Sequence, residues 1–328
     1  MTSRRRFLAL ALAPAVAPLA AAQPGAAPRR IATLSAFPRG DVDALLASVT
    51  RELGRLGWIE GRTIAFLPPR LSEGRYDRLP ALAAEVAGLG PDVVLVQSAP
   101  ATRAMARATG TIPIVMVGVG DPVAAGLVRS YVDPGANVTG SSYLVNESSR
   151  KALQVLKEIA PKIGSVAVFV NPGNDGAPSY VREMREAGKA LGLRVQVVEV
   201  AGAADFDAAF DAVARERTHS LIVGPEPLLR VHRAAIAGFA LRERLPFMIV
   251  GASRYLDSGA LASYGPSFDQ YPVLTARYVD RILRGANPAS LAIEQPAKFD
   301  LAINIATAKA IGLAIPDAVL ARADEVIR

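Results

Sequence analysis

The sequence has no cysteine, and only two histidines and one tryptophan occur among its 328 residues. Without cysteine the chain has no thiol nucleophile, no disulfide, and no cysteine-ligated zinc or iron–sulfur site. The two histidines, His219 and His232, are too few for a histidine-rich metal site, and neither has a serine or carboxylate at a recognisable catalytic spacing. We therefore expect no cofactor, no metal and no enzymatic nucleophile–base pair.

The beginning of the chain has the features of an export signal. Three arginines precede an apolar stretch, residues 7–22, which ends in three alanines typical of a cleavage site. This stretch is too short to span a bilayer and contains Pro14 and Pro18, so we predict cleavage rather than a permanent anchor. Residues 3–8 resemble a twin-arginine leader, although the ordinary secretory route stays open. The prediction is a cleaved export signal at 1–22, a flexible tether at 23–30, and a periplasmic location.

The net charge of +7 does not by itself indicate binding to nucleic acid. Three of the positive charges belong to the predicted leader, and their removal leaves +4. The remaining sequence has no Lys/Arg block interleaved with aromatic residues, which is typical of nucleic-acid surfaces. It also has no phosphate loop of the GxxxxGK[ST] type. We expect no nucleic-acid partner and no nucleotide hydrolysis.

Short apolar runs alternate with amphipathic stretches from residue 31 onward, and this rhythm restarts at residue 165. Uniformly apolar strands suit a parallel sheet that is covered by helices on both faces. The predicted fold is therefore α/β, with two doubly wound parallel-sheet lobes. The predicted strands are 31–35, 63–67, 92–97, 114–117, 166–170, 194–200, 221–223 and 247–250, and the predicted helices are 42–56, 79–89, 101–108, 180–191, 206–215 and 231–244.

A weak internal repeat supports the two lobes. An apolar strand, a helix and a second strand that follows a proline occur around Pro113 and again around Pro246, 133 positions later. This offset is about the length of one domain. The other interpretation is that prolines are simply common at strand entries.

Small polar residues follow several of the predicted strands, which is where ligands bind in open α/β sheets. If the lobes face each other, these segments line one cleft and offer backbone N–H groups to an anionic group. Aromatic rings at Phe37, Tyr143 and Tyr255 either stack on a planar ligand or pack in the core and at its rim. The predicted ligand-binding residues are Ser35, Phe37, Ser98, Ala99, Gly120, Asp121, Tyr143, Asn171, Asn174, Glu226 and Ser253.

Two of these segments also have a purely structural interpretation. The run Gly118-Val119-Gly120 begins like a dinucleotide-binding loop, but Val123 stands where a third glycine is needed. Asp121 is instead predicted to cap a helix that begins at Pro122, and its carboxylate either only caps or also faces a ligand. Residues 171–175 are rich in turn-forming residues, so they are either a plain strand-to-helix connection or a source of amide donors.

Short motifs occur in a characteristic order along nearly the whole chain. They are LGWIEGR at 56–62, YDRLPALA at 76–83, GDPV at 120–123, GLV at 126–128, PGANVTG at 134–140, NPGN at 171–174, IN at 303–304 and TAKAIGL at 307–313. Together these motifs resemble those of ABC-transporter substrate-binding proteins of the type I periplasmic-binding fold, in the group with tryptophan- and other amino-acid-binding members. After Asn174 the chain departs from the family pattern, which tends to continue with a second Pro-Asn pair.

The resemblance implies two lobes joined by three crossings near Leu144, Gly265 and Lys298, which close on a small ligand. The lobes would be 31–144 plus 265–297 and 145–264 plus 298–328. The protein would bind a small polar metabolite, such as an amino acid or derivative, and deliver it as a monomer to an ABC permease in the inner membrane. Alternatives that remain open are a periplasmic enzyme on the same architecture and a ligand-sensing partner without a permease.

We also expect roles for individual candidates in such a cleft. Ser98, Asn171 and the backbone amides at strand ends would hold a carboxylate. Asp121 or Glu226 would hold an amine.

Overall fold

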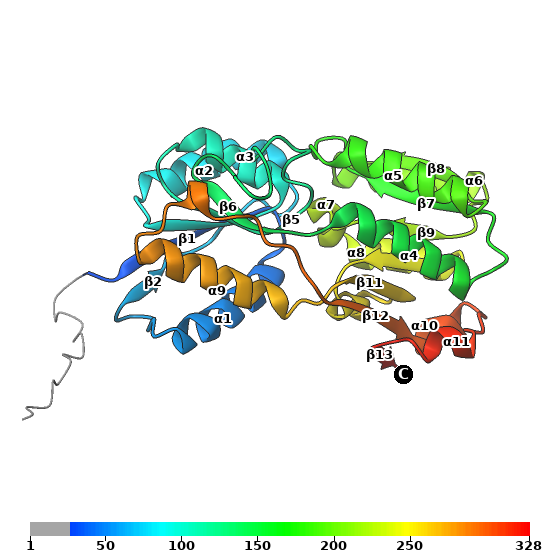
Figure 1. Cartoon of the computed structure of the whole chain (residues 1–328). Helices are drawn as coiled ribbons and strands as arrows, with labels where there is room; N and C mark the ends of the chain where they lie inside the picture. Colours follow the sequence, from blue (N-terminus) through cyan, green and yellow to red (C-terminus); the bar gives the residue numbers. More distant parts are fainter. Residues whose placement is uncertain (1–26) are drawn as a thin grey trace, which may run out of the picture.

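The computed structural model describes residues 27–328, which form two α/β lobes lying side by side (Figure 1). The predicted export signal at 1–22 lies outside the described residues. Within the described part, no helix is long and apolar enough to cross a membrane. The predicted fold class is confirmed, because each lobe has a mainly parallel sheet with helices on both faces.

The first lobe is built on a six-stranded parallel sheet of order β2-β1-β4-β5-β6, with β3 paired to β1. Alternate residues of each strand face opposite layers of helices. Val93 and Leu95 pack with the core under α1 and α9, whereas Val94 and Val96 pack with that under α2 and α3. The elements are β1 (Arg29–Ser35), α1 (Arg39–Arg55), β2 (Ile64–Phe66), β3 (Arg70–Leu71), η1 (Tyr76–Arg78), α2 (Leu79–Gly88), β4 (Val93–Gln97), α3 (Ala99–Ala108), β5 (Ile114–Val119), β6 (Val138–Ser142), α9 (Gln270–Leu283) and η4 (Pro288–Ser290).

The second lobe is built on a seven-stranded sheet of order β13-β12-β11-β10-β9-β7-β8. All of its pairs are parallel except β11 with β12. The strand β7 is buried along its whole length, as expected for a strand covered on both faces. The elements are α4 (Val145–Ile159), β7 (Ser165–Val170), α5 (Ala177–Ala190), β8 (Arg194–Glu199), η2 (Ala203–Asp205), α6 (Phe206–Arg215), β9 (Leu221–Val223), α7 (Pro227–Val231), α8 (Arg233–Arg242), β10 (Phe247–Val250), η3 (Ser253–Ser258), β11 (Ala262–Pro266), β12 (Phe299–Asn304), α10 (Ile305–Ala310), α11 (Asp317–Leu320) and β13 (Glu325–Ile327).

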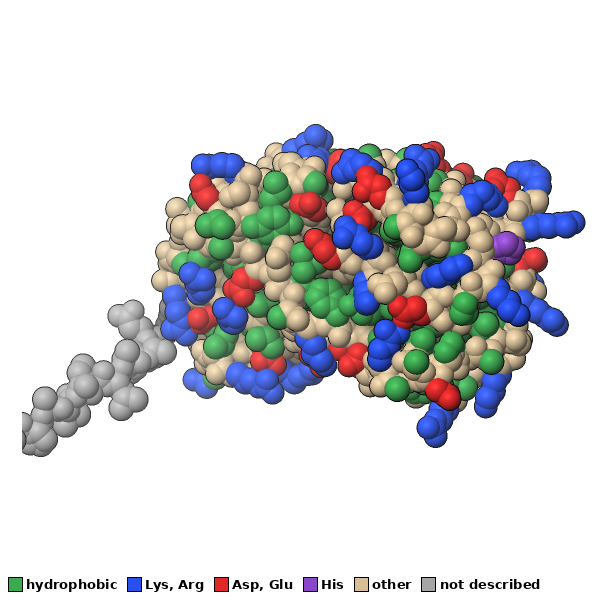
Figure 2. Space-filling model, turned by 45° about the vertical axis from the view of Figure 1, so that its right-hand side comes forward, with side chains coloured by type: hydrophobic (Ala, Val, Ile, Leu, Met, Phe, Trp, Pro, Cys, Tyr) green, Lys and Arg blue, Asp and Glu red, His purple; other side chains and the backbone are tan. Residues whose placement is uncertain are grey.

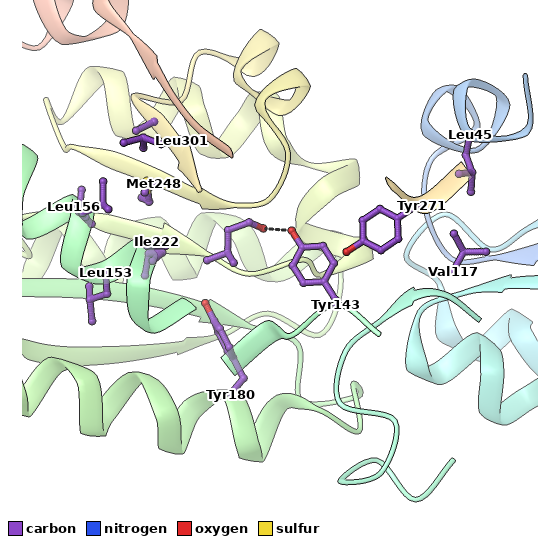
Figure 3. Packing of buried hydrophobic residues seen from close by; sticks show 14 of the residues in the cluster. Leu45, Val117, Tyr143, Leu153, Leu156, Tyr180, Ile222, Met248, Tyr271 and Leu301 are labelled. Atoms are coloured by element: carbon purple, nitrogen blue, oxygen red, sulfur yellow. Dashed lines mark hydrogen bonds between the residues drawn. The ribbon is translucent and has the colours of Figure 1, made fainter. Parts of the chain in front are cut away.

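The chain passes between the two sheets three times, after β6, after β11 and before β12. After β11 it returns to the first lobe as α9, which packs against α1 and β5 (Figure 1). The crossings are tightly packed: a Cβ added at Gly265 would lie 2.8 Å from the Tyr143 hydroxyl and from the Gly251 nitrogen. Figure 3 shows Tyr143 at this crossing, with its hydroxyl donating to the Val250 carbonyl at 3.4 Å and its ring stacked on Tyr271.

The internal repeat is visible in the hydrogen bonds of the two sheets. The Pro113 carbonyl accepts from the Val94 amide at 2.9 Å, and the Pro246 carbonyl accepts from the Leu221 amide at the same distance. Each proline therefore precedes a strand with an equivalent parallel partner: Pro113 precedes β5, which pairs with β4, and Pro246 precedes β10, which pairs with β9. The lobe boundaries predicted along the chain stay a prediction.

The structure corrects one sequence-based expectation. No helix begins at Pro122; residues 122–126 form turns, and Gly126 has a φ of +64°, which interrupts a right-handed helix. The helix predicted at 231–244 is α8, Arg233–Arg242, and the short helix α7 precedes it. His232 lies between α7 and α8. The centroid of its ring is 4.6 Å from that of Phe206, and partial burial lowers its pKa.

The pattern analysis did not predict β6, β11 or β12 as strands. The segments VTGSS and ASYGP contain small and polar residues instead of an apolar run. They are strands because their neighbours bury them: α9 packs on β6, and α4 packs on β11. Tertiary contacts therefore override a weak local preference at these positions.

Candidate functional site

A cavity between the lobes collects most of the predicted ligand-binding residues. It encloses about 880 Å³, part of which is open to solvent, and residues of both lobes line it. Of the predicted residues, the first lobe contributes Phe37, Ser98, Ala99, Gly120 and Asp121, and the second contributes Asn171, Asn174 and Glu226.

Ser98 connects the end of β4 to the start of α3. Its φ is +80°, in the region that favours glycine, and its side-chain oxygen accepts from the Ala101 amide at 3.4 Å. Such a backbone conformation persists only when the surroundings impose it, and strain of this kind clusters at functional sites. It brings the positive end of α3 to the cavity wall, where the helix dipole favours an anionic group.

Asp121 caps the turn that follows β5. Its Oδ1 accepts from the backbone amides of Val123 at 3.1 Å and Ala124 at 3.0 Å, and from the Tyr131 hydroxyl at 3.3 Å. Burial, together with the nearby Asp121 charge, raises the pKa of Tyr131 to about 12, so this hydroxyl stays protonated and donates. Asp121 therefore caps a turn and not the helix that the sequence predicted, and it also lines the cavity.

Glu226 is the centre of a buried hydrogen-bond cluster that joins the lobes. Its carboxylate accepts from the Tyr76 hydroxyl at 2.5 Å, the Asn174 amide group at 2.5 Å, the Asn171 amide group at 3.3 Å and the Leu228 backbone at 3.3 Å. Tyr76 belongs to the first lobe and the others to the second. Burial raises the pKa of Glu226, and these donors act against that rise. Burial, followed by the Glu226 charge, likewise raises the pKa of Tyr76.

The raised pKa of Glu226 predicts a pH effect on stability. A carboxyl whose folded pKa is above its usual 4.5 stabilises the fold most below that pH, and this contribution is lost as the pH rises through the folded pKa. Between pH 4 and 7, we expect the melting temperature of the native protein to fall relative to that of Glu226→Gln. The exposed Glu243→Gln is the control, and an equal trend in both variants would contradict the assignment.

The remaining predicted residues lie elsewhere. Ser35 is fully buried and does not line this cavity. Its hydroxyl donates to Gln97 at 3.1 Å and accepts from the Phe37 amide at 3.1 Å. Tyr143 and Tyr255 line a second cavity, which adjoins the first at Phe37. Ser253 begins η3, but its side chain lies outside the described part of the chain.

The sequence analysis missed two residues that join the lobes. Arg230 on α7 donates to Asp41 on α1 through Nε at 2.7 Å and through Nη2 at 3.1 Å, and their side chains are 9% and 13% exposed. Arg230 follows Glu226, the N-cap of α7, by four positions, and its backbone amide donates to the Glu226 carbonyl at 2.9 Å. This spacing is the signal that could have indicated it. No local signal links Asp41 to Arg230 across 189 positions. A third interlobe contact pairs Arg103 with Asp175 at 2.7 Å.

The donor set suits an organic ligand better than a metal. Within residues 27–328, no group of three or more histidine, aspartate or glutamate side chains is placed to hold a metal ion. The cavity instead offers amide donors, a helix N-terminus and the Asp121 carboxylate. Such a set can bind carboxylate and ammonium groups together.

The chain is similar in sequence to a family of known proteins. Residues 69–327 match the family described as ABC transporter substrate binding protein. A protein of Clostridioides difficile named "Tyrosine-binding protein" is 26% identical over 229 residues, which are 68% of this chain and 63% of that relative. The chain thus spans less than two thirds of the length of this curated relative.

Two solved structures have similar folds. A conserved domain protein from Vibrio cholerae is 30% identical, with a TM-score of 0.84 over 91% of this chain and 99% of that chain. The ABC domain from Streptococcus pneumonia, in complex with L-Trp, is 21% identical, with a TM-score of 0.84 over 92% of this chain and all of that chain.

Proposed function

Because this chain belongs to the ABC transporter substrate-binding protein family, we propose that it captures an amino acid or an amino-acid derivative between its lobes and delivers it to an ABC permease. The observation that carries the proposal is the interlobe cavity, whose polar groups come from both lobes. The names of the relatives support it as well, since one is called a tyrosine-binding protein and another was solved with L-Trp.

The two ends of an amino acid have matching groups in the first cavity. Ser98 and the start of α3, with Asn171 opposite, suit the carboxylate, and Asp121 suits the ammonium group. We assign the ammonium to Asp121 rather than to Glu226, because the Glu226 carboxylate already accepts four hydrogen bonds. A ligand held from both lobes favours the closed arrangement, since the open one offers it only half of these contacts.

The test is a thermal-shift screen of the protein without residues 1–22 against amino acids, nucleosides and sugars. We expect a rise of several degrees with at least one amino acid, because a ligand at about 100 times its Kd stabilises by about 2.7 kcal/mol. X-ray scattering with that ligand should show a smaller radius of gyration. No shift with any amino acid would contradict the ligand class, and a shift without compaction would contradict closure.

Export to the periplasm is part of the proposal. Mass spectrometry of protein from the periplasmic fraction should find an N-terminus after residue 22.

We also propose a monomer that does not bind nucleic acid. On the face shown in Figure 2, basic side chains are interspersed with acidic ones, which supports this expectation.

A further inference from the structure

Two of the motifs found in the sequence meet at Glu226, across the boundary between the lobes. Tyr76 opens the motif at 76–83 in the first lobe, and Asn171 and Asn174 belong to the motif at 171–174 in the second. The Tyr76 hydroxyl and both side-chain amides donate to the Glu226 carboxylate. Both asparagines line the first cavity, whereas Tyr76 lines neither cavity. Tyr76 is therefore placed to act on a ligand only through Glu226.

Glu226 determines which way the two asparagine side chains face. Each amide oxygen accepts from a backbone amide two positions later, that of Gly173 at 2.9 Å or that of Gly176 at 3.0 Å. A carboxylate only accepts hydrogen bonds, so each amide nitrogen has to face Glu226. Turning either amide over would put its oxygen against the carboxylate and its nitrogen against a backbone N–H. An amide nitrogen carries two hydrogens, so Asn171 keeps a second one for the ligand carboxylate assigned to it above.

The first lobe lies very close to the start of α7 beside this cluster. Gly74, two residues before Tyr76, is held in its own lobe by a hydrogen bond from its backbone amide to the Ala36 carbonyl at 2.8 Å. A Cβ added at Gly74 would lie 2.9 Å from the Cα of Leu228 in the second lobe, and its next two neighbours are also atoms of Leu228. Since Tyr76 and Glu226 belong to different lobes, their hydrogen bond forms only while the lobes are in contact.

Resting on the proposed function, we propose that Tyr76 and Glu226 are positioning residues, which hold the two asparagine amides in place for the ligand carboxylate when the lobes meet. When the lobes separate, water replaces the Tyr76 hydroxyl at Glu226 and competes there with the asparagine side chains. Closure therefore strengthens the preference for a carboxylate. Because coupling is reciprocal, binding of the carboxylate also favours closure.

Calorimetric titration of the protein without residues 1–22 tests the role of Tyr76. The probes are the standard amino acids and, for the one that binds most tightly, its carboxamide, which has a neutral group in place of the carboxylate. Tyr76→Phe keeps the ring and removes only the hydroxyl. We expect it to weaken the amino acid about 10-fold and the carboxamide less than about 3-fold, because a carboxamide can donate as well as accept and depends less on how the asparagines face.

A double-mutant cycle tests whether Tyr76 acts through Glu226. Glu226→Gln should weaken the amino acid at least as much as Tyr76→Phe does, because the amide nitrogen of glutamine cannot accept. The double variant should bind within about 2-fold of Glu226→Gln alone, since the two residues act as one unit. Tyr278→Phe is the matched control, because this buried hydroxyl donates to the Ala292 carbonyl and lines neither cavity. It should lower the melting temperature and leave affinity unchanged.

Gly74→Ala tests the contact between the lobes separately. Its control is Gly61→Ala, because Gly61 has a φ of +78°, close to the +82° of Gly74, and nothing lies within 4 Å of its added Cβ. Both variants should lower the melting temperature of the unliganded protein to a similar extent. Only Gly74→Ala should also weaken the amino acid, by at least about 5-fold, because its Cβ collides with Leu228 when the lobes meet.

The outcomes distinguish this inference from the proposed function. If amino acids bind but Tyr76→Phe weakens the amino acid and its carboxamide equally, or weakens neither, the positioning role is refuted and the proposed function stands. Additive losses in the double variant would refute the path through Glu226. If no amino acid binds to the native protein, the proposed function fails and this inference fails with it.

Discussion

Replacing Arg230 by methionine is expected to lower ligand affinity about 100-fold while changing the melting temperature of the unliganded protein little. The pair of Arg230 and Asp41 is largely buried because the lobes meet, with side chains 9% and 13% exposed. Removing one partner of a buried pair leaves an uncompensated charge, which costs about 3–5 kcal/mol. When the lobes are open, water solvates the Asp41 carboxylate. The cost of burying this unpaired charge therefore opposes closure of the lobes rather than folding. Titration calorimetry and calorimetric melting measure the two effects separately.

A double-mutant cycle provides the control for this prediction. Asp41→Leu with Arg230→Met removes both charges, and we expect it to recover much of the affinity that Arg230→Met loses, because no charge is left unpaired. The exposed pair Arg129 with Asp133 lies within one lobe, and Arg129→Met should leave affinity unchanged. A fall in melting temperature as large as the fall in affinity would show that the pair stabilises the fold and not closure.

Replacing Gly140 by alanine is expected to lower the melting temperature by about 10 °C or more. Gly140 pairs with Met116 in the sheet and has a φ of +126°. An added Cβ would lie 2.5 Å from the Met116 nitrogen and closer still to its carbonyl oxygen, and backbone cannot move aside as a side chain tip can. Strained φ and overpacking each cost about 1–3 kcal/mol, and about 1 kcal/mol shifts the melting temperature by about 2–4 °C in a protein of this size class.

Gly57→Ala separates the two causes. Gly57 has a φ of +91°, but nothing lies within 4 Å of where its Cβ would be. Gly57→Ala therefore introduces a strained φ but no steric clash, and we expect the melting temperature to fall by only a few degrees. Equal falls for Gly57→Ala and Gly140→Ala would show that the contact with Met116 contributes nothing.

The sequence by itself determined the fold class and much of the first cavity. Apolar strands such as β4 and β7 have to be covered on both faces, so their composition predicts a parallel sheet between helices before any contact is known. Parallel strands also bring their carboxyl ends to one edge, which is why Ser98, Asp121 and Asn171 could be grouped from their positions after strands.

The tertiary structure alone decided which groups are free to bind a ligand. Glu226 follows a strand like the others, but contacts with Tyr76 and two asparagines occupy its carboxylate. Pairs such as Asp41 with Arg230 join residues 189 positions apart. Local patterns report only which face of its own element a residue occupies. Which carboxylates already have partners, and which residues pair across the lobes, depends on contacts between segments far apart in the sequence.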